Sequence, residues 1–73
     1  ATYAGYEIVL LNNEGRYKEA LNLTQEALRT LEEGNGTPRD LSVGYINVAN
    51  EWQYLGDLKA ATSFYLKAAE IAQ

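Results

Sequence analysis

The sequence predicts an all-α fold made of two stacked antiparallel helical hairpins. One observation is that apolar residues recur at steps of three and four, which is the period of a helix face. Another is an internal repeat, and alanines within it indicate closely packed helices, because a small side chain lets two helix axes approach. Identical residues recur 41 positions apart in four pairs: Gly15 and Gly56, Lys18 and Lys59, Ala20 and Ala61, and Ala27 and Ala68.

The first half is expected to hold two helices. Residues 1–13 form the first, and the helix stops at Asn12 to Gly15, because asparagine and glycine tolerate the left-handed backbone of a helix end. Its apolar residues fall on two neighbouring rows: Tyr3, Tyr6 and Leu10, and Ala4, Ile8 and Leu11. A second helix opens at Gly15 or Arg16 and ends before Gly34. Its apolar face is continuous and consists of Tyr17, Ala20, Leu21, Thr24, Ala27, Leu28 and Leu31.

The second half begins with a well-marked helix start. Thr37 offers a capping hydroxyl, Pro38 suits the first helical position, and Asp40 is an acid in the first turn. We expect one helix from about Pro38 to Leu55 and another from Asp57 to about Ala72. The expected core face of the former is Leu41, Tyr45, Val48, Ala49, Trp52 and Leu55. The expected core face of the latter is Leu58, Ala61, Tyr65, Ala68, Ala69 and Ala72.

Composition narrows the function classes. The 73 residues make one domain, and a net charge of −4 repels a phosphate backbone, so no nucleic-acid partner is expected. The longest apolar run, Ile8 to Leu11, is far shorter than the roughly 20 residues of a membrane span, so no membrane insertion is expected. The absence of cysteine is compatible with a reducing compartment, and we expect a cytoplasmic location.

The order of glycine, large residue, alanine, aromatic residue and alanine resembles the tetratricopeptide repeat. That repeat is nominally about 34 residues long, and the spacing of 41 is similar to the lengthened variety of kinesin light chains and bacterial peptide-sensing regulators. The resemblance implies a first repeat over about 1–34, a linker over about 34–37 and a second repeat over about 38–73. A plain four-helix bundle is the alternative.

The two copies fit the repeat pattern unevenly. The second copy matches throughout, whereas in the first copy Thr24 stands in place of an aromatic residue. Three further departures fall on the first helix, where a large, a large and a small residue are expected: Ala4, Glu7 and Ile8. Either this helix is rotated or its register is shifted.

The resemblance also implies a ligand groove along the first helix of each hairpin. The groove positions of the second copy are Val43, Ile46, Asn47, Asn50, Gln53 and Tyr54. Those of the first copy are Tyr6 and Val9, together with Thr2, Gly5, Asn12 and Asn13. In peptide-binding members an asparagine at the position of Asn47 pairs with the main chain of an extended peptide; a solvated helix asparagine is the alternative. The lysine of a carboxylate clamp would fall at Gly5 or Ile46, so a clamp is not expected.

Catalysis has little support in the sequence. Without histidine or cysteine, a general base has to be a carboxylate in a cleft, and the acids are scattered over polar faces. Glu7 is the one acid that we place inside an apolar stripe. No glycine-rich phosphate loop is present. We therefore expect neither an enzyme nor a bound cofactor or metal.

The repeat pattern and the composition leave two classes of function. The first is a scaffold for protein–protein interaction that binds a peptide or helix of a partner in the groove. The alternative is a structural or self-associating helical segment without a ligand of its own. For the alternative, we expect an exposed edge on the last helix, where a flanking repeat or the second subunit of a homodimer would stack. This edge consists of Phe64, Leu66 and Ile71.

Overall fold

A computed structural model of the chain contains four helices and no strand within the described residues, 4–34 and 36–72. The helices are α1 (Ala4–Asn13), α2 (Tyr17–Glu33), α3 (Pro38–Tyr54) and α4 (Leu58–Ala72). The predicted all-α class is confirmed, and the other helix ends lie within two residues of the expected ones, while the expected start of the first helix at residue 1 falls outside the described residues. Residues 1–3, Asn35 and Gln73 lie outside the described residues, as does the burial of Ala4, Gly5 and Ala72. The predicted groove positions Thr2 and Gly5 and the predicted apolar residue Tyr3 therefore lie outside the residues whose burial is described.

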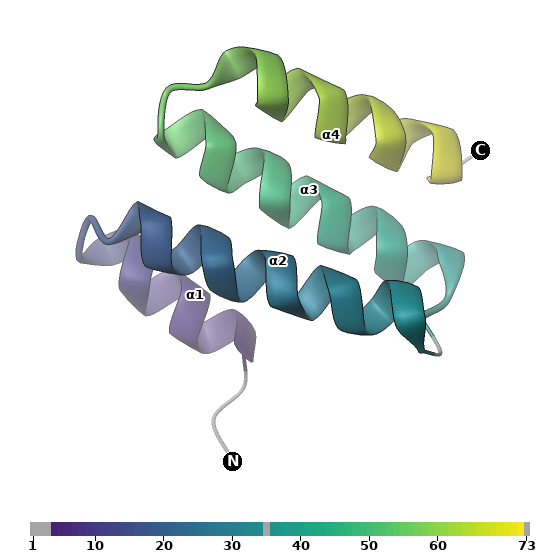
Figure 1. Cartoon of the computed structure of the whole chain (residues 1–73), viewed down its shortest axis with the longest axis horizontal. Coiled ribbons are helices and arrows are strands. Elements are labelled where there is room, and N and C mark those ends of the chain that lie inside the picture. Colours follow the sequence, from purple (N-terminus) through teal and green to yellow (C-terminus); the bar gives the residue numbers. More distant parts are fainter. Residues whose placement is uncertain (1–3, 35, 73) are drawn as a thin grey trace.

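Each helix packs against the next one along the chain. Figure 1 shows α2, α3 and α4 side by side and running in alternating directions, with α1 behind α2. The contact between α3 and α4 is the most extensive, and α1 packs on α2 but not on the backbone of α3. The space between α1 and α3 is therefore bounded by side chains.

The turns after α1 and α3 have the same hydrogen-bond geometry. Gly15 and Gly56 have φ angles of 79° and 88°, in the left-handed region that favours glycine. The amide of Gly15 donates to the carbonyl of Asn12 over 3.0 Å, and that of Arg16 donates to Leu11 over 2.8 Å. The equivalent bonds after α3 run from Gly56 to Gln53 over 3.0 Å and from Asp57 to Trp52 over 2.9 Å. Both turns are thus Schellman motifs, and the sequence repeat corresponds to a repeated backbone structure.

The start of α3 has the predicted cap. The hydroxyl oxygen of Thr37 accepts from the amide of Asp40 over 3.1 Å, and the Asp40 carboxylate accepts from the amide of Thr37 over 3.4 Å. Pro38 occupies the first helical position. This capping box fixes the residue at which α3 begins.

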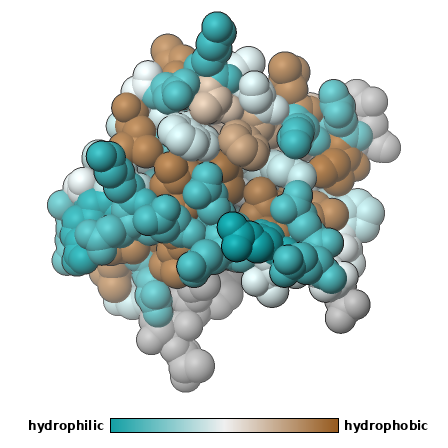
Figure 2. Space-filling model, viewed as in Figure 1, coloured by the Kyte–Doolittle hydropathy of each residue, from teal (hydrophilic) through white to brown (hydrophobic). Residues whose placement is uncertain are grey.

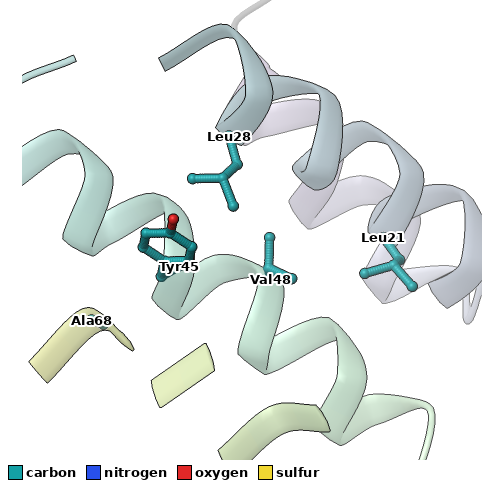
Figure 3. Packing of buried hydrophobic residues seen from close by; sticks show 5 residues of the cluster. All are labelled: Leu21, Leu28, Tyr45, Val48 and Ala68. Atoms are coloured by element: carbon teal, nitrogen blue, oxygen red, sulfur yellow. The ribbon is translucent and has the colours of Figure 1, made fainter. Parts of the chain in front are cut away.

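The core lies between α2, α3 and α4. Figure 3 shows Leu28 and Leu21 of α2 pointing toward Tyr45 and Val48 of α3, with Ala68 of α4 on the opposite side of α3. The predicted core faces of α2 and α3 are confirmed, since their central residues are buried. The hydrophobic residues packed against this cluster are Leu41, Trp52, Leu55, Phe64 and Ile71, so Trp52 is a core residue as expected.

Ala61→Leu is expected to lower the free energy of unfolding by about 1–3 kcal/mol, because the extra methylene groups overpack a filled space. Ala61 is almost completely buried where α4 contacts α3. Thermal unfolding followed by circular dichroism measures the change. Ala69→Leu is the matched control on the exposed side of the same helix and should change stability little. Equal melting temperatures for wild type and Ala61→Leu would contradict the assigned packing.

Helix α4 is turned relative to the prediction. Leu58 is 65% exposed, and Tyr65 and Ala69 are exposed too, so three of the expected core residues face outward. Ala61 and Ala68 are buried as expected, and Phe64 and Ile71 complete the inward-facing stripe. The ring of Phe64 stacks on that of Tyr45 with centroids 6.1 Å apart. This orientation partly buries two large apolar side chains, and the Tyr65 hydroxyl at the edge of α4 donates to Asn50 and Gln53 of α3.

The predicted stacking edge is therefore wrong for two of its three residues. Phe64 and Ile71 are partly buried against the core, and Leu66 alone is exposed, at 60%. An outward-facing apolar surface exists on α4, but it contains Leu58 and Leu66.

Helix α1 also presents a different face from the expected one. Tyr6 and Leu10 are exposed, while Ile8 and Leu11 are half-buried. Only the second of the two predicted rows therefore packs inward. The polar residues of α2 that face away from the core are exposed, and Figure 2 shows hydrophilic side chains along this helix on the face in view.

Candidate functional site

A cavity of about 250 Å³ lies between α1 and α3. Ile8, Val9 and Asn12 of α1 form one wall, and α3 forms the other with Asn47, Asn50, Glu51 and Tyr54. A second hollow of about 220 Å³ shares Ile8 and Asn47 with the first and extends past Val43 toward the start of α3, over α2. The two hollows follow one side of α3 along much of its length.

The structure brings together part of the predicted groove. Val9, Asn12, Asn47, Asn50 and Tyr54 line the first cavity, and Val43 lines the second hollow. The four residues of α3, Val43, Asn47, Asn50 and Tyr54, recur at steps of four, three and four, so they share one face of that helix.

Four predicted groove residues lie elsewhere. Tyr6, Asn13 and Ile46 are exposed but line neither hollow. Gln53 is exposed on the α4 side, where its Oε1 accepts from the Tyr65 hydroxyl over 3.1 Å. The predicted groove face was too broad, because Gln53 contacts α4 and position 46, seven residues earlier, lies on the same side of α3.

Asn50 and Tyr54 are held by neighbouring side chains. The Oδ1 atom of Asn50 accepts a hydrogen bond from the Tyr65 hydroxyl of α4, which leaves its amide nitrogen available as a donor. The ring of Tyr54 stacks on Tyr17 at the start of α2, with centroids 5.1 Å apart and an angle of 16° between the planes. Side chains fixed in this way lose little conformational freedom on binding.

A buried carboxylate lies in the wall of the cavity. Glu51 is only 2% exposed, and its Oε2 accepts from Nδ2 of Asn12 over 2.8 Å. Two further acceptors of this pair, Oε1 of Glu51 and Oδ1 of Asn12, are buried without a hydrogen-bond partner within the described residues. Among the described residues, no basic side chain lines the cavity. Burial raises the pKa of Glu51 above its usual value, and the Asn12 hydrogen bond opposes this effect only in part.

Glu51 is the residue that the sequence analysis missed. Glu7, which was placed inside an apolar stripe, is only half-buried, whereas Glu51 is among the most buried side chains. The sequence does contain a signal: Glu51 lies in a row with Gly44, Val48 and Leu55, at steps of four, three and four, and two of these residues belong to the core face of α3. An acid in such a row faces a neighbouring helix when one is present.

No family model, curated protein or solved structure matches the chain. Within the described residues, no helix has the length and apolar character of a membrane span. The site therefore has to be interpreted from its own geometry.

Proposed function

We propose that the chain is a tetratricopeptide-like interaction module that binds an extended peptide of a partner protein in the groove between α1 and α3. The observation that carries the proposal is the shared cavity wall of Asn47 and Asn50, which places two amide side chains on one side of α3 beside apolar Val9. An amide group offers both a donor and an acceptor, and can therefore pair with the main chain of a peptide whatever its sequence.

Two further features support this proposal. The repeated Schellman turns at Gly15 and Gly56 agree with a structure built from two copies of one hairpin. The hollows continue along α3 past Val43, so an extended segment can follow the helix over several residues. The net charge of −4 favours peptides that are basic or apolar.

Asn47→Ala is expected to weaken peptide binding about five-fold or more, because it removes a main-chain hydrogen-bonding pair worth about 1 kcal/mol. The probe is the tightest-binding member of a library of acetylated and amidated heptapeptides, and the measurement is titration calorimetry. Asn47 is exposed, so the fold should be unaffected. Asn22→Ala, an exposed asparagine of α2 away from the groove, is the matched control and should leave the affinity unchanged.

Unchanged affinity in the double variant Asn47→Ala and Asn50→Ala would refute the groove assignment. A structural segment without a ligand would leave every library peptide unbound. Asn47→Ala tests peptide binding more specifically than Asn50→Ala does, because Asn50→Ala also removes an acceptor of the Tyr65 hydroxyl.

A further inference from the structure

The cavity between α1 and α3 contains acceptors without donors. Oε1 of Glu51 and Oδ1 of Asn12 have no hydrogen-bond partner within the described residues, and each exposes less than 1 Å². A buried acceptor without a partner is costly, and a buried carboxylate without a counter-ion is more so. A ligand that supplies both N–H donors and positive charge would relieve both costs.

We propose that this cavity binds the ammonium group of a lysine side chain of the bound peptide, with Glu51 as its counter-ion and Asn12 as a second acceptor. The proposal rests on the proposed function for the kind of ligand, and adds the chemistry that the groove selects. It assigns Glu51 a role in ligand recognition.

The arrangement of the acceptor oxygens in the cavity favours an ammonium over a guanidinium. Oε2 of Glu51 already accepts from Asn12, so only one carboxylate oxygen is free. A guanidinium binds a carboxylate best through both oxygens at once, whereas the three N–H bonds of an ammonium diverge and can reach separate acceptors. Glu51 Oε1 and Asn12 Oδ1 are two such acceptors.

The rest of the cavity suits the stem of a lysine. Ile8, Val9 and the ring of Tyr54 provide apolar surface for its methylene groups. Because each of the two free oxygens exposes less than 1 Å², α1 has to move away from α3 to admit the ammonium. Such a movement breaks no close backbone contact between the two helices, since α1 packs on α2 and not on the backbone of α3.

The charge of Glu51 links binding to pH. The carboxylate has to be ionised to act as counter-ion, so affinity for a lysine peptide should rise as the pH increases through the pKa of Glu51, which burial has raised. The other titratable side chains at the cavity are Tyr54 of α3 and, stacked on it, Tyr17 of α2. No acid or base of α1 lines the cavity.

The first test is calorimetry with the tightest lysine-containing heptapeptide of the library and its norleucine and arginine counterparts. Norleucine is expected to weaken binding about ten-fold or more, because a hydrogen bond to a charged group is lost, and arginine should bind more weakly than lysine. In Glu51→Gln the lysine and norleucine peptides should bind about equally. Glu26→Gln, an exposed acid of α2, is the control and should keep the discrimination. Equal wild-type affinities for lysine and norleucine, or discrimination that survives in Glu51→Gln, would overturn the proposal.

The second test needs no substitution and uses a small probe. The side-chain carboxyl carbon of Glu51 is titrated by ¹³C NMR with and without Nα-acetyl-lysine N-methylamide. The lysine amide should lower the pKa of Glu51, and its norleucine analogue should not. Identical titration curves with and without the lysine amide would refute the ammonium site.

The two proposals fail in different ways. If lysine and norleucine peptides bind equally and Asn47→Ala weakens both, the groove binds peptides and the ammonium site alone is refuted. If no library peptide binds while Glu51 still responds to the lysine amide, the peptide function is refuted and the ammonium site remains.

Discussion

Leu28→Ala is expected to lower the free energy of unfolding by about 2–5 kcal/mol. Leu28 is buried between α2 and α3 and points toward Tyr45 and Val48 (Figure 3). Its side chain also fills the space beside Gly44, where an added Cβ atom would lie 3.0 Å from Cδ1 of Leu28. Truncation removes apolar contacts and leaves a cavity that α2 and α3 can close only in part. A domain of this size has a free energy of unfolding of about 3–5 kcal/mol, so a large share of the Leu28→Ala molecules should be unfolded.

Urea unfolding followed by circular dichroism measures this effect. Leu58→Ala is the matched control, because the same atoms are removed from a side chain that is largely exposed on α4. The control should change stability by about 0.5 kcal/mol or less. A loss of less than about 1 kcal/mol for Leu28→Ala would mean that α2 does not pack on α3 as described.

Glu51→Gln is expected to abolish a loss of stability that wild type suffers as the pH rises. Because burial raises the pKa of Glu51 in the folded state, the folded chain holds this proton more tightly than the unfolded chain does. The resulting stabilisation is complete below the ordinary glutamate pKa of about 4.3 and is lost as the pH rises through the raised folded-state pKa. Each unit by which the pKa is raised corresponds to about 1.4 kcal/mol.

The measurement is the difference in unfolding free energy between Glu51→Gln and wild type over a pH series. This difference should grow in favour of the variant across that window and level off above it, while groups common to both proteins cancel. The exposed Glu26→Gln is the control, and its difference curve should not rise in this way. A flat or falling curve for Glu51→Gln would show that Glu51 is not buried as described.

The helices and the cores of α2 and α3 were predictable because their sequences separate apolar from polar residues clearly. The face of α2 from Ala20 to Leu28 has charged residues on its other sides. The start of α3 is fixed locally by Thr37 and Asp40, and the turns at Gly15 and Gly56 need only a residue that tolerates positive φ. Such features depend on neighbours in the sequence rather than on the rest of the fold.

The orientations of α1 and α4 were not predictable in the same way. Residues 8–11 of α1 are all apolar, so no single face stands out. In α4, Leu58 and Tyr65 are spaced seven residues apart on one face, as Phe64 and Ile71 are on another, so the sequence does not show which face is buried. The contact between Phe64 and Tyr45 determines the orientation. The burial of Glu51 depends on where α1 lies relative to α3, which no local pattern determines.

The most direct test of peptide binding between α1 and α3 is isotope-filtered NMR of the labelled chain with the tightest-binding library heptapeptide. We predict nuclear Overhauser contacts from the peptide to the Val9 methyl groups and to the side-chain amide of Asn47, which line the same cavity. Contacts to the exposed methyl groups of Leu58 and Leu66 on α4, with none to Val9 or Asn47, would contradict this claim.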